Sequence, residues 1–231
     1  MIELIHDAIP NKLKTRHAKG TPLKPKKAWT GFGRGNGKKE IRNILKLLQK
    51  GLCVYCEEKL NKYGFHIEHI LSKTLNPCLT FEYTNLSLSC MTQLDELKEE
   101  YGITFKNRSC GHSELKSANE YIEQLFIKPT EKKCNSLFSY ISNGKIIYSK
   151  NCSDWNKLRV NHTLAVLNLN CLRLERDRRE ILEKQYQIME ELKNNEEALN
   201  KFIELELKEE NNEYLNSFIS MREEHYSLFR D

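Results

Sequence analysis

Four of the eight cysteines have the spacing of a metal site. Cys53 and Cys56 form a C-x2-C pair, and Cys90 and Cys110 follow later in the chain. A C-x2-C pair places two thiolates on one tight turn, so both can bind the same tetrahedral ion. Nineteen residues separate Cys90 from Cys110, and an inserted helix at 92–100 whose ends return to the same place would explain this gap. We therefore predict a structural Zn²⁺ site; the alternative is that two of the four are simply buried.

A short run between the cysteine pairs has the residue types needed for hydrolysis. Residues 65–70 read FHIEHI, which places Glu68 directly before His69. A carboxylate can bind a hard divalent ion, and an imidazole can take a proton from water. We expect this run to be a strand, in which neighbouring side chains point to opposite faces. Both groups can then serve one site only if the backbone bends near Ile70.

The order of these motifs resembles the HNH endonuclease motif. The resemblance is carried, in chain order, by the C-x2-C pair, Glu68-His69, Asn85-Leu86, Cys110-Gly111-His112 and Lys116. A closer likeness is to the nuclease subunit of the Septu anti-phage system, a family that also occurs beside retrons. It rests on the sequence CVYCE at 53–57 and on Leu167-Asn168-Leu169-Asn170 with Arg173. The likeness covers about residues 40–180.

The resemblance implies a role for each residue of the motif. His69 would be the general base that activates water, and Glu68 would bind the catalytic ion, Mg²⁺ or Mn²⁺. Asn85 would hold the loop after the strand so that His69 is aimed correctly. His112 would be the second ligand of the catalytic ion.

The second metal ligand has competing candidates. In compact HNH sites this ligand directly follows the second cysteine of the pair, whereas His112 lies one position later. Asn107 or His66 would then take its place. Lys116 would contact the scissile phosphate or a neighbouring one, and a solvated lysine at the start of a helix is an equally good interpretation.

The resemblance also implies the fold and the partners. We expect an α+β fold that is mainly helical, with a ββα-metal, treble-clef-like core stabilised by zinc. The activity would be metal-dependent cleavage of nucleic acid, DNA more than RNA or tRNA, as the toxic effector of an anti-phage system. The partner would be an ABC- or SMC-like ATPase, joined in retrons by a reverse transcriptase and its msDNA. Without catalysis, the same residues would form a zinc-dependent nucleic-acid-binding or adaptor module.

Positive charge is concentrated near the N-terminus. The net charge is +5, but residues 11–50 carry thirteen Lys or Arg and a single acid, Glu40. Such an excess attracts phosphate backbones. The residues that we expect to bind substrate here are Lys26, Lys27 and Arg34. Lys, Pro and Gly alternate over 11–37, which predicts an extended basic arm with little regular structure. Trp29 is expected to pack onto the parent domain.

The remaining elements divide the chain into three regions. We predict a basic arm at 1–37, a zinc-stabilised nuclease core at 38–130, and a β-hairpin with helices at 131–231. The predicted helices span 38–50, 92–100, 117–126 and 154 to the end, with breaks near 194–195 and 211–212; the strands span 65–70, 85–89, 137–141 and 145–149. Asn143-Gly144 is a strong hairpin signal between the last two strands. Residues 164–174 are expected to pack under the nuclease centre.

Several further residues are expected to be structural or solvated. The other cysteines have no metal-site spacing and are predicted to be small core residues: Cys78, Cys134, Cys152 and Cys171. The arginines that follow residue 172 alternate with acids, which favours a solvated helix face: Arg173, Arg176, Arg178 and Arg179. No stretch approaches the roughly 18 apolar residues of a membrane helix, and residues 1–11 lack a secretory h-region. We therefore expect a cytosolic protein, in which disulfides are rare.

Overall fold

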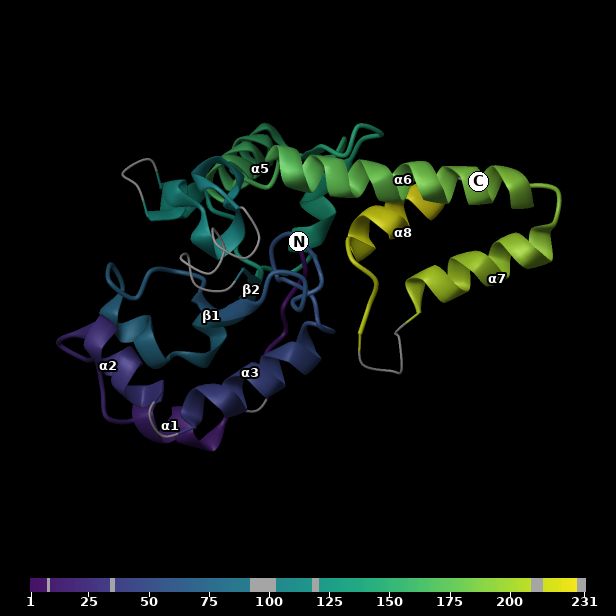
Figure 1. Cartoon of the computed structure of the whole chain (residues 1–231). Helices are drawn as coiled ribbons and strands as arrows, with labels where there is room; N and C mark the ends of the chain where they lie inside the picture. The colour runs from purple at the N-terminus through teal and green to yellow at the C-terminus, as the bar shows by residue number, and fades with distance from the viewer. Residues whose placement is uncertain (8, 34–35, 92–102, 118–120, 209–213, 228–231) are drawn as a thin grey trace.

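The candidate catalytic residues lie on a two-stranded antiparallel sheet. The computed structural model describes residues 1–7, 9–33, 36–91, 103–117, 121–208 and 214–227 (Figure 1). β1 (Phe65–His69) pairs with β2 (Leu86–Cys90), and Glu68 lies opposite Ser87. Both predicted strands are confirmed, and all five residues of β2 are buried, so this strand has both faces in the core.

The N-terminal segment is folded onto the core, which corrects the prediction of an extended arm. The helices of this half are α1 (Asn11–His17), α2 (Pro25–Phe32) and the predicted α3 (Gly37–Leu48). Pro25 is the first residue of α2, where its missing N–H is harmless and its fixed φ favours the helix. Trp29 is only 8% exposed and packs against Phe81 and His69. The predicted packing of Trp29 is confirmed, and this apolar anchor outweighs the Lys, Pro and Gly composition.

The C-terminal half is a β-hairpin followed by helices. Its elements are β3 (Phe138–Tyr140), β4 (Ile146–Tyr148), α5 (Asp154–Val166), α6 (Leu172–Leu192), α7 (Glu196–Leu207) and α8 (Ile219–Ser227). The predicted hairpin is confirmed, and so is the break at 194–195, where Asn195 caps α7. The sequence did not predict a further break at 167–171. There Asn168 adopts the left-handed conformation, with a φ of 49°.

Short 3-10 turns connect these elements. They are η2 (Pro77–Phe81), η3 (Tyr83–Asn85), η4 (Phe105–Asn107), η5 (Cys110–His112), η6 (Glu114–Ser117), η7 (Glu123–Leu125) and η8 (Cys134–Leu137). In place of the helix predicted at 117–126, the described residues form η6 and η7, with 118–120 outside the described part. The helix predicted at 92–100 and the break predicted at 211–212 also lie outside the described residues.

Two arginines of α6 are buried, which corrects the prediction of a solvated basic face. Arg178 donates from Nε to the carbonyl oxygen of Gly144 at 2.5 Å and from Nη2 to that of Leu169 at 2.7 Å. These bonds join α6 to the β3–β4 hairpin. Arg173 is buried as well. The exposed members of the series are Arg176 and Arg179. The prediction of a solvated face, which rested on the alternation of arginines with acids, therefore holds for only two of the four arginines.

The two halves share one hydrophobic core. In Figure 1, α1, α2 and α3 lie on one side of β1 and β2, and α5 and α6 lie on the other. One cluster of buried apolar side chains includes Leu13, Leu88 and Met221, which come from all three predicted regions. The division into those regions stays a prediction, whereas the mixture of helices and two small sheets agrees with the predicted α+β class.

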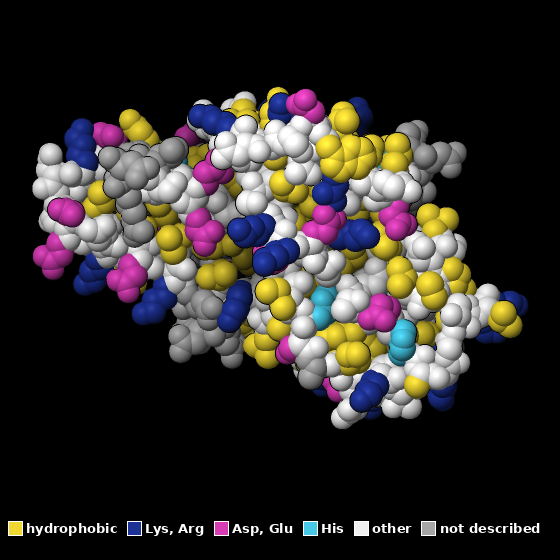
Figure 2. All heavy atoms as spheres, turned by 180° about the vertical axis from the view of Figure 1, so that it is seen from behind, with side chains coloured by type: hydrophobic (Ala, Val, Ile, Leu, Met, Phe, Trp, Pro, Cys, Tyr) yellow, Lys and Arg dark blue, Asp and Glu magenta, His cyan; other side chains and the backbone are white. Residues whose placement is uncertain are grey.

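On the face shown in Figure 2, basic, acidic and apolar side chains are interspersed. Within the described part of the chain, no helix combines the length and the apolar character that spanning a bilayer requires.

Candidate metal centre and catalytic site

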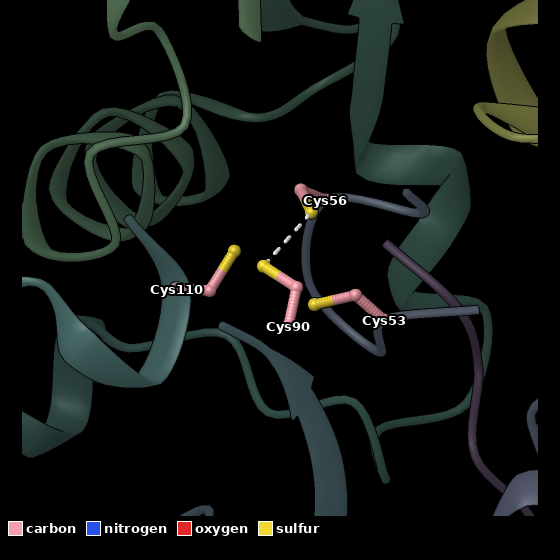
Figure 3. Close-up of side chains that lie close together, drawn as sticks. All are labelled: Cys53, Cys56, Cys90 and Cys110. Carbon is pink, nitrogen blue, oxygen red and sulfur yellow. Dashed lines mark hydrogen bonds between the residues drawn. The ribbon is translucent and has the colours of Figure 1, made fainter. Parts of the chain in front are cut away.

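Four cysteines converge on one point in the core. Cys53 and Cys56 lie on the turns before β1, Cys90 ends β2, and Cys110 begins η5; their sulfur atoms all lie within 4.8 Å of one another. Figure 3 shows these atoms directed into a common space, with Cys56 and Cys90 3.6 Å apart. A tetrahedral Zn²⁺ with bonds of about 2.3 Å holds its sulfur ligands about 3.8 Å apart. The four predicted residues therefore fit one zinc ion.

The electrostatics of the cluster also favour a bound cation. Burial raises the pKa of Cys53, but hydrogen bonds with the other three cysteines outweigh burial and hold this pKa well below its usual value. Burial and neighbouring thiols instead raise the pKa values of Cys56 and Cys110. Several thiolates at one buried point repel one another. A zinc ion supplies the positive charge that lets all four sulfur atoms ionise.

Side chains from α6 and from the turn before it hold the zinc-site segments together. Arg173 donates to Glu58 Oε2 at 2.6 Å and to Ser109 Oγ at 3.1 Å. Asn168 donates from Nδ2 to the carbonyl oxygen of Arg108 at 2.8 Å. These bonds connect the segment before Cys110 with the knuckle of the C-x2-C pair. Residues 164–174 therefore lie against the metal centre, as the sequence predicted.

The remaining cysteines differ in their surroundings. Cys134 and Cys171 are buried, as predicted, and Cys152 is partly buried. Cys78 is exposed in η2, which corrects its assignment to the core. In η2 the buried residues are Thr80 and Phe81, and Cys78 faces solvent instead. No disulfide joins any of the eight cysteines.

His69 is held in one tautomer by the backbone. Its Nε2 lies 3.1 Å from the carbonyl oxygen of Thr80, which can only accept, so Nε2 carries the hydrogen. The lone pair is therefore on Nδ1, 3.3 Å from the Lys73 ammonium nitrogen. Burial and then the charge of Lys73 lower the pKa of His69 to about 3. The ring is neutral at pH 7, and its Nδ1 can accept a proton.

Asn85 braces the loop that carries the Thr80 carbonyl. Its Oδ1 accepts from the N–H of Leu71 at 2.8 Å, and its Nδ2 donates to the carbonyl oxygens of Leu71 at 3.0 Å and Leu79 at 3.2 Å. The buried side chain thus ties the two ends of the loop together and fixes Thr80 against His69. This position suits the holding role that the sequence predicts, and the role itself stays a prediction.

Glu68 is paired with a buried lysine. Its Oε1 accepts from the ammonium of Lys116, which also donates to the Tyr55 hydroxyl at 3.1 Å and to the carbonyl oxygen of His69 at 3.2 Å. The Lys116 side chain is only 10% exposed, so the interpretation as a solvated lysine is wrong. Burial lowers the pKa of Lys116 to about 7, and the charge of Cys53 acts in the opposite direction.

His66 lies on the other side of the Glu68 carboxylate. Its Nδ1 lies 2.9 Å from the carbonyl oxygen of Met91 and carries the hydrogen, so the Nε2 lone pair lies 3.2 Å from Glu68 Oε2. The imidazole nitrogen and the carboxylate oxygen are both acceptors, so a proton or a cation shared between them stabilises this contact. A Cβ at Gly111 would lie 2.7 Å from both atoms. Glycine therefore leaves the space beside this donor pair open, and a carboxylate with an imidazole suits a divalent ion.

The other candidate ligands differ in how close they come to this pair. The ring of His112 lies beside that of His66, with centroids 4.2 Å apart. The backbone carbonyl oxygen of Asn107 lies 3.9 Å from the sulfur of Cys171, and no contact between Asn107 and Glu68 is seen among the described residues. Among the described residues, only the four cysteines place three or more ligand atoms within 4.8 Å of one another. The Glu68 group is therefore a looser arrangement than the zinc site.

Glu68 and His69 border the same cavity, although neighbouring strand residues point to opposite faces. The cavity has a volume of about 160 Å³ and is also lined by Lys73, Lys116 and Tyr121. β1 ends at His69, so the chain can turn there and bring both groups to one side. A larger cavity of about 490 Å³ lies between β3, α6 and α8 and has a mostly apolar lining. Glu224 and His225 also line it, but the Glu224 carboxylate accepts from the Ser139 hydroxyl and from the Tyr140 N–H, which ties it to β3. The smaller cavity is therefore the catalytic candidate.

The predicted substrate lysines lie on the surface of α2. Lys26 and Lys27 are exposed, and Arg34 is outside the described residues. Two neighbours of the site were not predicted: Lys73, which lies beside His69, and Gly111, which lies beside Glu68 and His66. Lys73 follows His69 by four residues, but this spacing has no fixed meaning in a loop. Only the fold identifies these neighbours.

Comparison with known proteins adds one clear similarity. No family model matches the chain. A protein of Vibrio cholerae serotype O1 biovar El Tor, named "Retron Vc95 putative HNH endonuclease", is 32% identical over 170 residues. The similar region makes up 72% of this chain and 75% of that protein.

Proposed function

Because this chain belongs to the HNH endonuclease family, we propose that it is a metal-dependent endonuclease that hydrolyses phosphodiester bonds in nucleic acid. The observation that carries the proposal is the pairing of Glu68 and His69 at one cavity, with the His69 lone pair on Nδ1. The zinc centre stabilises the two strands that present this pair. His69 is the general base, and Glu68 is a ligand of the catalytic ion.

In the proposed mechanism, the proton of the attacking water passes to His69. Nδ1 of His69 takes the proton from the attacking water, while the Thr80 carbonyl keeps the hydrogen on Nε2 and holds the ring in place. Asn85 keeps the Thr80 loop at this position. Stabilisation of charge on the phosphate and on the leaving 3′ oxygen is the chemistry that a bound Mg²⁺ or Mn²⁺ supplies. Glu68, His66 and the adjacent His112 would hold that ion.

The biological role that we propose is the effector of an anti-phage system. The name of the Vibrio cholerae relative associates that protein with a retron, and the sequence resembles the Septu nuclease subunit. We propose an ABC- or SMC-like ATPase as partner, with a reverse transcriptase and its msDNA where a retron is present. DNA is the proposed substrate.

Cleavage by the purified complex tests the activity directly. The chain is co-expressed with its genomic neighbours and incubated with plasmid DNA and with total tRNA, in Mg²⁺, in Mn²⁺ and in EDTA. We expect DNA to be cut in either metal and to stay intact in EDTA, because the leaving oxygen then lacks Lewis-acid stabilisation. Cleavage of tRNA alone would change the substrate, and cleavage of neither would favour a non-catalytic zinc module.

Replacement of His66 tests the composition of the catalytic metal site. We expect His66→Ala to weaken Mn²⁺ binding by about tenfold or more, because it removes the imidazole that faces Glu68. Calorimetric titration of the zinc-loaded protein measures this affinity without any substrate. His112→Ala is measured in parallel, and His162→Ala on α5 is the matched control. Unchanged affinity in His66→Ala with a loss in His112→Ala would return the ligand role to His112 alone.

A further inference from the structure

Three lysines from separate elements converge beside the catalytic histidine. Lys73, in the loop after β1, lies 3.3 Å from His69 Nδ1. The ammonium of Lys38, at the start of α3, lies 5.0 Å from the ring centroid of Trp29. The same indole ring packs edge-on against His69 at 4.6 Å. Lys26 on α2 belongs to the same group, because its charge acts on Lys73.

These positive charges are close enough to affect one another. Burial, then Arg42 and then Lys73 lower the pKa of Lys38. Burial and then Lys26 lower the pKa of Lys73. None of the ion pairs between described residues gives Lys26, Lys38 or Lys73 an acidic partner. Like charges that are held together without counter-charges favour an anion.

The surroundings of the lysines distinguish them from ordinary solvated side chains. Lys38 and Lys73 are partly buried. Lys73 lines the cavity beside His69, and Lys38 is held over the Trp29 ring, where its charge also acts on His69. Trp29 is itself buried, so it supports Lys38 and His69 and is not available to stack on a base. The lysines are therefore placed to meet the backbone of a bound strand, which carries phosphate groups at regular intervals.

We propose that Lys26, Lys38 and Lys73 form the phosphate-binding side of the catalytic cleft, and that substrate phosphate draws Lys73 away from His69. This inference rests on the proposed nuclease function. In the free protein the ammonium of Lys73 donates a hydrogen bond to the lone pair on His69 Nδ1. A phosphate oxygen is an anionic acceptor and forms a stronger hydrogen bond with the ammonium than a neutral imidazole does. Binding of the substrate then leaves Nδ1 available for the water.

Binding measured without cleavage tests this assignment. The zinc-loaded chain is titrated with a fluorescent DNA duplex in EDTA at several salt concentrations, as wild type, Lys38→Met, Lys73→Met and the double variant. Each lost phosphate contact lowers the slope of log Kd against log salt by about 0.9, and we expect roughly threefold to tenfold weaker binding at low salt for each single variant. Lys184→Met, at an exposed position of α6, is the matched control and should match the wild type.

The outcomes separate the inference from the proposed function. Wild-type binding with a normal salt slope, together with an unchanged slope in the double variant, would overturn the lysine assignment and leave the nuclease proposal intact. An absence of salt-dependent binding by the wild type would overturn both. In the metal-loaded protein, Lys73→Met should mainly raise KM, as expected for a substrate contact, whereas a residue that only supports the fold would lower thermal stability in step with activity.

Discussion

Replacing His69 by alanine is expected to lower the cleavage rate by about 10²–10⁴-fold, the usual contribution of a general base. No other described side chain places an imidazole nitrogen against both Lys73 and the Thr80 carbonyl. Water would therefore have to lose its proton to solvent. The substitution leaves the four cysteines and Glu68 in place, so the protein should retain its zinc and its affinity for Mn²⁺.

Cleavage rates and zinc content have to be measured on the same preparations. His17→Ala is a suitable control, because His17 is a half-exposed histidine on α1. It should cut at the wild-type rate. A His69→Ala protein that keeps both its zinc and most of its activity would contradict the assignment of the base. A His69→Ala protein that has lost its zinc would show a structural role for Trp29 packing on this ring, and His69→Gln would then be the variant to compare.

Replacing Cys90 by serine is expected to abolish stoichiometric zinc binding and to destabilise the fold strongly. Cys90 ends β2, so it links the knuckle and the Cys110 turn to the strand pair that carries Glu68 and His69. Structural zinc contributes about 10–16 kcal/mol in zinc-finger peptides. If about 5 kcal/mol of this is lost here, the Tm falls by about 10–20 °C in a chain of this size.

Metal analysis and thermal melting together test the zinc centre. Cys78→Ser is the matched control, because Cys78 is an exposed free thiol outside the cluster. It should keep one zinc per chain and the wild-type Tm. One equivalent of zinc and an unchanged Tm in Cys90→Ser would mean that the four cysteines are ordinary core residues. Activity should disappear together with the zinc, since the strand pair loses its support.

The sequence alone determined the elements and motifs whose signals are local. The C-x2-C pair defines a knuckle because its two thiolates share one turn. The strand at 65–70, the Asn143-Gly144 hairpin signal and the helix break at 194–195 each depend on a few neighbouring residues. For that reason β1, the hairpin and the start of α7 were predicted where the structure has them.

Only the tertiary structure decided which distant residues meet at the site. His66 and Glu68 share one face of β1 because they are two residues apart, but the approach of Gly111 to this pair depends on the fold. The sequence did not predict α1 and α2, because the surfaces on which Leu13 and Trp29 pack are formed by distant residues. Burial of Arg173 and Arg178 depends on acceptors that lie far away in the sequence. Contacts between distant segments, their desolvation and the tautomer of His69 are properties of the assembled core, and no local pattern encodes them.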